Sequence, residues 1–160
     1  MKISNAENRH SPVSFVPVKS DEFESLFAVV KDALFGLVDE VFGWDDEYQR
    51  HRLQHEYQPD WFYWLEHDNQ RKGMICYKFD GSHAHVHLLV VFAAFRNQTL
   101  GEAAMEKVIQ LAHKRDSDKV TLSSFLSNSA AIRFYLRLGF EQSPSDENFC
   151  TMQLSLASRI

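Results

Sequence analysis

The chain has 160 residues, a formal net charge of −5 and 44% hydrophobic residues. This length is typical of one domain with its own core, and the apolar content excludes a disordered chain. The acidic balance argues against a nucleic-acid module, which needs a basic surface. No apolar run reaches the ~18 residues of a membrane span. We therefore expect a single domain over 1–160 that works without nucleic acid or a membrane.

The N-terminus and the cysteines indicate a compartment. The opening sequence MKISNAENRHSPVSF has no apolar core of a secretory signal. Cys76 and Cys150 form no disulfide framework, so we expect two buried free thiols in a reducing environment. Together these features predict a cytoplasmic protein.

The first elements are a short strand and two helices. Residues 13–18 read VSFVPV, a strand that Pro17 places at an edge or an end. Apolar residues then recur with helical spacing from Phe23, and we expect this helix to break or kink at Gly36 and to end at Gly43. An acidic first turn begins a second helix over 44–57, which Pro59 closes.

The middle of the chain predicts an antiparallel meander. Three strands are expected at 61–67, 73–79 and 84–92, separated by short polar turns. The last of them, AHVHLLVVF, is the longest.

The second half alternates between helix and strand. Helical patterns cover 100–114 and 129–138, and a strand at 119–124 lies between them. A strand, helix and strand of this size normally form a parallel, right-handed crossover. Final strands are expected at 140–142 and 149–156. The fold class is therefore α+β, with a mixed, mostly antiparallel sheet of six to seven strands and about four helices on both faces.

The segment 88–110 carries the first functional signal. It passes from a buried strand through the polar turn 96–99 into an amphipathic helix. Such a turn presents free backbone N–H groups and the positive end of the helix dipole, which suit an anion. The sequence lacks the glycine patterns of a P-loop and of a dinucleotide site. An ordinary strand–helix connection remains the alternative.

Two motifs raise the anion site above that alternative. RNQTLG at 96–101 resembles motif A of the GNAT acyltransferase superfamily, whose pattern is [RQ]-x-x-G-x-[GA] after a strand. SNSAAIRFYLRLGF at 127–140 resembles the later family segment, with Asn near a helix start and Tyr ahead of Gly-Phe. The chain departs from the first pattern at Thr99, which stands where the family has glycine, and Glu102 would stand near an anionic cofactor.

This resemblance implies that acetyl-CoA is the cosubstrate, with no metal. The amides of 97–102 would hold its pyrophosphate, and the strand end 90–92 would pair with its pantetheine arm where the strand splays from its neighbour. The implied contacts are Val90, Val91, Phe92, Arg96, Asn97, Gln98, Thr99, Leu100, Gly101, Glu102, Asn128, Ala131 and Tyr135.

Tyr135 is the best candidate for a catalytic acid. It shares one helical stripe with Asn128 and Ala131, and the resemblance implies that it protonates the leaving CoA thiolate. A phenol with a reference pKa of about 10 is protonated at neutral pH, as this role requires. The alternatives are a core tyrosine packed on Phe134 or Phe140, and a purely structural N-cap for Asn128.

Three histidines are candidates for the base that deprotonates the amine. His83, His85 and His87 alternate along the strand and should share one face. His85 and His87 lie nearest the expected splay and have a suitable pKa. They are equally well explained as half-exposed strand residues. An H-x-H zinc site is a weaker alternative, because no Cys or acidic partner is spaced to complete it.

The acceptor site is expected between the first two helices and the strand ends. Trp44, Asp45 and Glu47 belong to an acidic and aromatic cluster that would attract a cationic amine, with Trp44 as a cation–π face. An acidic turn that favours the helix dipole explains the same residues.

The sequence thus predicts an N-acetyltransferase in which an amine attacks acetyl-CoA directly. A strand N–H near Val90 would polarise the carbonyl. A small-molecule or peptide amine is the expected partner, and a homodimer stays open. A non-catalytic acyl-CoA-binding sensor of the same fold is the alternative.

Overall fold

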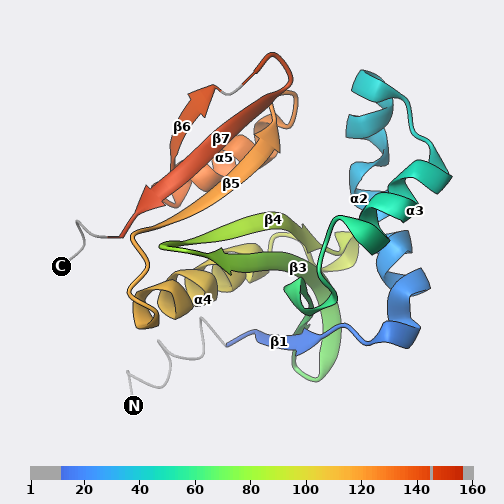
Figure 1. Cartoon of the computed structure of the whole chain (residues 1–160). Helices are drawn as coiled ribbons and strands as arrows, with labels where there is room; N and C mark the ends of the chain where they lie inside the picture. Colours follow the sequence, from blue (N-terminus) through green and yellow to red (C-terminus); the bar gives the residue numbers. More distant parts are fainter. Residues whose placement is uncertain (1–11, 145, 157–160) are drawn as a thin grey trace.

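The computed structural model describes residues 12–144 and 146–156. It contains one seven-stranded sheet in the order β1-β2-β3-β4-β5-β7-β6 (Figure 1). Only β4 and β5 run parallel, so the predicted mixed, mostly antiparallel sheet is confirmed. Most of the N-terminal sequence that lacks a signal core lies outside the described residues. Within them, no helix is long and apolar enough to cross a membrane.

The strands fall close to their predicted positions. Their bounds are β1 Ser14–Pro17, β2 Phe62–His67, β3 Gln70–Asp80, β4 His83–Val91, β5 Lys119–Phe125, β6 Glu141–Pro144 and β7 Phe149–Ser155. The strand β3 begins three residues earlier than 73 because Asp68 and Asn69 alone make the turn. Both adopt left-handed backbone angles, with φ of 54° and 61°, which a tight hairpin requires.

Four α-helices and three short 3-10 turns complete the described fold. The α-helices are α2 Phe23–Phe42, α3 Asp46–His55, α4 Leu100–Lys114 and α5 Ser129–Arg137, and the 3-10 turns are η1 Ser20–Glu22, η2 Pro59–Trp61 and η3 Ala93–Phe95. The predicted break at Gly36 is wrong, because α2 runs through this exposed glycine. One solvent-exposed glycine costs a helix only about 1 kcal/mol. Gly43, with φ of 78°, does end the helix, as expected.

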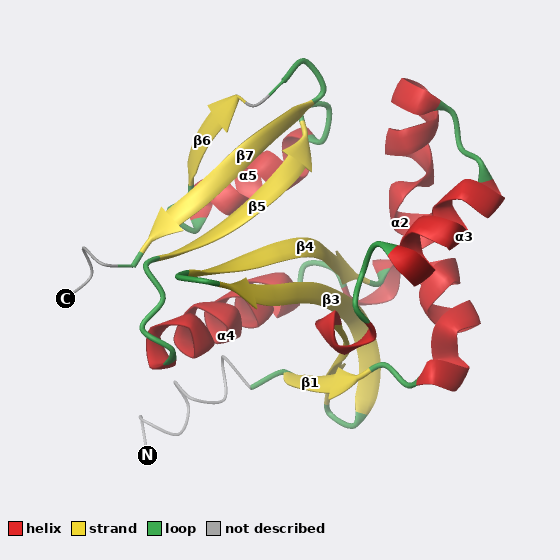
Figure 2. Ribbon diagram, in the orientation of Figure 1, coloured by secondary structure: helices red, strands yellow, loops and turns green. Residues whose placement is uncertain are grey.

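The helices cover both faces of the sheet, as Figure 2 shows. Helices α2 and α3 pack through Leu26, Phe27 and Leu53 on one face. Helices α4 and α5 pack through residues such as Met105 and Tyr135 on the other. Cys76 and Cys150 are buried free thiols, as predicted.

The parallel pair in the middle of the sheet is incomplete. Strands β4 and β5 pair only over 83–86 and 119–122, although both continue beyond this ladder. The register between β3 and β4 also shifts, because Cys76 faces Leu88 whereas the next residue, Tyr77, faces Val86. His87 is therefore the extra residue of a β-bulge, which bends a strand locally. The two strands diverge at this point, and the predicted splay is present.

Candidate active site

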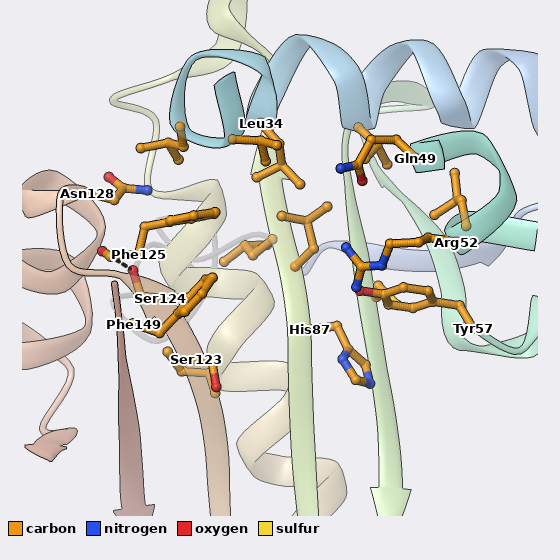
Figure 3. A pocket seen from close by; sticks show the side chains of 18 of the residues that line it. Leu34, Gln49, Arg52, Tyr57, His87, Ser123, Ser124, Phe125, Asn128 and Phe149 are labelled. Carbon is orange, nitrogen blue, oxygen red and sulfur yellow. Dashed lines mark hydrogen bonds between the residues drawn. The ribbon is translucent and has the colours of Figure 1, made fainter. Parts of the chain in front are cut away.

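A cavity of about 720 Å³ lies at the point where β4 and β5 diverge. Its walls are the second half of α2, helix α3, the diverging strands and the start of α5 (Figure 3). This volume is within the range of small-molecule sites. Because its lining includes both Leu53 beneath α3 and Tyr135 on α5, the cavity joins the two faces of the sheet through the gap.

His85 and His87 both line this cavity, and the contact between their rings places these two on the same side of β4. Their rings meet edge to face with centroids 4.7 Å apart. His85 Nδ1 lies 2.7 Å from the Thr121 hydroxyl on β5. His87 stacks on Trp61 at 5.1 Å and meets the edge of Tyr57 at 5.2 Å.

The surroundings keep both imidazoles neutral. Burial and the charges of His85 and Lys78 lower the pKa of His87 to about 4, and burial lowers the pKa of His85 in the same direction. Each imidazole is therefore unprotonated at neutral pH and has a lone pair. The Nε2 atom of His87 is buried with no hydrogen-bond partner among the described residues.

Tyr135, Asn128 and Ala131 approach the cavity from α5. Asn128 caps the helix by accepting from the Ala131 N–H at 3.3 Å, so its structural role is confirmed, and it also lines the cavity. Tyr135 packs against Phe134 and Phe140, as the structural alternative supposed, with ring centroids 5.0 and 5.6 Å away. It lines the cavity as well, and burial raises the pKa of its phenol. Core packing and access to the cavity are thus compatible.

A second hollow of about 230 Å³ continues from the cavity along β4. Val90, Val91 and Arg96 border it together with Asn128. The Phe92 N–H donates to the Lys72 carbonyl of β3, so Phe92 directs its backbone away from the hollow. Backbone direction alternates along a strand, and the polar groups of Leu89 and Val91 therefore face the gap instead of those of Val90. The Val91 carbonyl already accepts from Arg96 Nε at 3.1 Å.

The turn that follows β4 has the geometry of an anion site. Its residues Arg96, Asn97, Gln98 and Thr99 are exposed. The first helical bond of α4 runs from the Ala103 N–H to the Thr99 carbonyl. The preceding amides, from Leu100, Gly101 and Glu102, have no acceptor within the helix and no other partner among the described residues.

Thr99 adopts the conformation that glycine favours. Its φ is 62° and its ψ is 17°, which is left-handed and costly for a β-branched residue. Its hydroxyl donates to the Gln98 carbonyl at 2.5 Å. Thr99, which stands where the motif has glycine, thus adopts a backbone conformation that glycine reaches without strain. The close approach of α5 explains why position 101 is glycine, because a Cβ there would lie 3.3 Å from the Phe134 ring.

The predicted acceptor residues are only partly at the cavity. Asp45 lines it and caps α3 by accepting from the Tyr48 N–H at 3.1 Å. Trp44 and Glu47 line neither hollow. The Trp44 indole donates to Asp46 at 2.8 Å and packs against Phe27 and Phe35.

Sequence reasoning missed the polar side chains on the remainder of this wall. Gln49 and Arg52 reach the cavity from α3, and Tyr57 does so from the segment that follows it. Figure 3 shows the guanidinium of Arg52 pointing inward beside the Tyr57 hydroxyl. The spacing of Asp45, Gln49 and Arg52 is helical, so this stripe was visible as one face of the predicted helix.

This geometry is accompanied by a family match. A profile described as the acetyltransferase (GNAT) family matches residues 24–140. The chain belongs to the GNAT acetyltransferase family. The match runs from α2 to the residue before β6, and it includes every residue that lines the cavity except Phe149 of β7.

Known proteins agree with this assignment. An uncharacterized N-acetyltransferase of Methanocaldococcus jannaschii is 41% identical over 59 residues, which are 37% of this chain and 26% of that protein. The chain thus matches about a quarter of the length of this curated relative.

Solved structures share the fold at lower identity. The PaiA N-acetyltransferase of Thermoplasma acidophilum, in complex with coenzyme A, is 15% identical, with a TM-score of 0.71 over 90% of this chain and 99% of that one. Ard1 of Thermoplasma volcanium is 21% identical, with a TM-score of 0.67 over 90% and 97%. The ribosomal-protein-S18-alanine N-acetyltransferase of Escherichia coli is 17% identical, with a TM-score of 0.62 over 89% and 93%.

A zinc site at His85 and His87 would need a further protein ligand, and the described residues place none beside these two histidines. Among residues 12–144 and 146–156, no three His, Cys, Asp or Glu side chains are grouped as a metal site.

Proposed function

We propose that the protein transfers an acetyl group from acetyl-CoA to a primary amine by direct attack in a ternary complex. The observation that carries the proposal is the gap between β4 and β5. It connects an acid on α5, Tyr135, with two neutral histidines on β4, and all three line one cavity. The adjoining hollow leads to the exposed turn before α4.

The described residues fit a CoA molecule. The free amides at the start of α4 suit a pyrophosphate, and the gap-facing backbone of Leu89 and Val91 suits an amide-bearing arm. Asn128 borders both hollows, so a ligand that extends from one into the other would pass it. When bound there, acetyl-CoA supplies an acetyl thioester to the cavity.

His85 is our choice for the base. The Thr121 hydroxyl lies 3.5 Å from the Ala84 carbonyl, to which it can donate. Thr121 then accepts from the Nδ1–H of His85, and the lone pair of His85 is left on Nε2. His87 is the weaker choice, because its buried Nε2 and its pKa of about 4 make it a poor proton acceptor.

The protons balance with these two residues. His85 takes the proton that the amine nitrogen loses as its bond to the acetyl carbon forms. Tyr135 gives its proton to the CoA sulfur as the carbon–sulfur bond breaks. A backbone N–H of β4 that faces the gap, from Leu89 or Val91, would stabilise the charge on the carbonyl oxygen. Proton exchange between His85 and the tyrosinate through water restores both residues.

The test is thiol release from acetyl-CoA with a panel of amines. Tyr135→Phe is expected to lower kcat by at least about 100-fold, because general acid catalysis contributes roughly 10²–10⁴-fold. The affinity for acetyl-CoA should stay the same. Tyr63→Phe is a matched control, because Tyr63 packs on Phe15 and Tyr77 and does not line the cavity. Full activity of Tyr135→Phe would exclude Tyr135 as the acid.

A non-catalytic acyl-CoA sensor is the second candidate, and the strained Thr99 favours it. Calorimetric titration with acetyl-CoA separates the two, because a sensor binds the ligand and releases no thiol with any amine. The cytoplasmic location stays a prediction, and whether the chain forms a homodimer stays open.

A further inference from the structure

Arg52 is the single Arg or Lys among the described residues that line the cavity. It projects from α3, on the wall formed with Tyr57 and His87 (Figure 3). Both histidines of the cavity are neutral at pH 7, so Arg52 is the permanent positive charge of this wall. Its side chain is 37% exposed and forms an ion pair with Glu56, so the guanidinium is partly hydrated and can still bind an anion that enters the cavity.

The guanidinium has donors to spare. Its Nε donates to Glu56 at 3.1 Å, one helical turn along α3. One further N–H binds the Tyr57 hydroxyl. Burial raises the pKa of this phenol, and the charge and hydrogen bond of Arg52 oppose the rise. Arg carries five N–H donors in a planar fork. Three therefore remain, on the two terminal nitrogens that point inward.

The acid of the cavity does not neutralise this charge. Asp45 is exposed and uses its carboxylate to cap α3. It precedes Arg52 by seven residues, which places it about 10 Å away along the helix axis. Glu56 binds the Nε edge and does not line the cavity.

Arg52 also lies apart from the expected CoA phosphates. The anion site at the start of α4 adjoins the second hollow, and Arg52, Tyr57 and His87 do not border that hollow. The Tyr57 ring bridges the distance between Arg52 and His87, since its edge meets the imidazole at 5.2 Å. An anionic group on Arg52 would thus sit within one small molecule's length of the reacting amine.

We propose that the acceptor is a small amine that carries a carboxylate, and that Arg52 binds this carboxylate through its terminal nitrogens. The inference rests on the proposed acetyl transfer and names its substrate class. The apolar side chains of α2 and of the strand ends, such as Leu34 and Phe125, would surround the remainder of the molecule. This proposal reverses the preference for a cationic acceptor that the acidic sequence around Asp45 suggested. Arg52 would repel an acceptor that carried a further positive charge besides its amine.

The experiment compares amines that differ only in the carboxylate. Thiol release is measured with L-leucine, L-leucinamide and isopentylamine, with the corresponding phenylalanine series, and with spermidine. We expect kcat/KM to be at least about tenfold higher for the amino acid than for its amide, and higher still than for spermidine. Equal or better turnover of the amides or of spermidine would overturn the proposal.

Two variants test the residue itself. Arg52→Ala is expected to remove the preference for the amino acid over its amide, and Arg52→Lys to restore part of it. Glu56→Gln is the matched control, because it breaks the same ion pair and keeps the guanidinium. If Glu56→Gln lost the preference as fully as Arg52→Ala, the preference would depend on the ion pair between Arg52 and Glu56. It would then not depend on a contact between Arg52 and the carboxylate of the substrate.

A binding measurement keeps this inference separate from the proposed activity. N-acetyl-L-leucine and N-acetyl-L-leucinamide are titrated into the protein in the presence of CoA. Tighter binding of the acid in the wild type, lost in Arg52→Ala, supports the carboxylate site even if no amine is acetylated. Turnover without any such difference would reject the site and leave the acetyl transfer standing.

Discussion

The two walls of the cavity recognise their ligands by different chemistry. The wall built from the end of β4 and the start of α4 offers backbone groups: the gap-facing polar atoms of Leu89 and Val91, and the free amides of 100–102. The opposite wall offers side chains from α3 and the segment after it, with Arg52 and Tyr57 at its centre. The first wall depends on the path of the chain, and the second on which side chains it carries.

This difference predicts where the chain should tolerate change. A backbone amide binds an anion whatever side chain it carries, provided that the turn keeps its φ and ψ angles. Thr99 illustrates the point, since it holds a left-handed φ of 62° without being glycine. The wall of side chains has no such freedom, because the loss of one guanidinium removes its charge. We therefore expect the first wall to be sensitive to bulk and the second to be sensitive to chemistry.

The largest effect on acetyl-CoA binding is expected from adding bulk to the backbone wall. Gly101→Val places a branched side chain where even a Cβ would lie 3.3 Å from Phe134 and 3.8 Å from Val91. Overpacking of this kind costs about 1–3 kcal/mol, and it would move α4 away from α5. We expect the Kd for acetyl-CoA to rise at least about tenfold by calorimetry, with a lower free energy of unfolding.

Gly36→Ala is the control for that variant. A Cβ at Gly36 meets nothing within 4 Å, so alanine in the exposed middle of α2 should stabilise the protein by roughly 0.5–1 kcal/mol. Its affinity for acetyl-CoA should not change. If Gly101→Val bound acetyl-CoA as tightly as the wild type, the backbone wall would not be the cofactor wall.

An intermediate effect is expected at the boundary of the two walls, from His87. Its pKa is about 4 in the folded protein, against 6.5 for a free imidazole. The unfolded chain therefore binds the proton more tightly, and protonation favours unfolding. The free energy of unfolding should fall as the pH drops from about 7 towards 4 and should level off below that window.

Denaturant titrations at several pH values check this expectation. His87→Phe keeps a ring against Trp61 and should flatten part of the slope, and His85 would account for some of the remainder because burial lowers its pKa too. His51→Gln, a change of an exposed histidine on α3, is the control. A slope unchanged in His87→Phe would show that the ring is not sheltered between Trp61 and Tyr57.

The smallest effect is expected from relaxing the turn. Thr99→Gly removes a Cβ from a left-handed residue, which costs an L-amino acid about 1–2 kcal/mol. We expect a gain of about 1 kcal/mol in the free energy of unfolding, reduced by the extra entropy of glycine in the unfolded chain. Acetyl-CoA should bind slightly more tightly.

Thr99→Ala separates strain from the hydroxyl. It keeps the Cβ and loses the hydrogen bond to the Gln98 carbonyl. If alanine and glycine stabilised the protein equally, the hydroxyl and not the backbone angle would be responsible.

The sequence predicted the first wall better than the second for a physical reason. An anion site at a helix start is encoded locally, in the few consecutive residues of 96–102, and the Asn128 cap and Tyr135 lie on one helical stripe. The position of Arg52 depends on how α3 packs over β4. This packing is part of the tertiary structure and is not encoded in a short stretch of sequence. The bulge at His87 was hidden for another reason: an extra residue inverts the alternation of a strand, but the residues that follow, LLVV at 88–91, are all apolar and show no inversion.

The incomplete ladder between β4 and β5 has a consequence for the solvent. Beyond Val86 and Leu122, each strand presents an edge towards the other with no partner strand between them. Exposed edges on a protein's outside invite aggregation, whereas these edges line a cavity whose other walls are α2, α3 and the start of α5. Buried backbone groups must still be satisfied, so in the free protein water has to occupy this slot. Ligand binding is then an exchange of ordered water for amide groups, and its measured enthalpy and entropy will report this displaced water together with the new contacts.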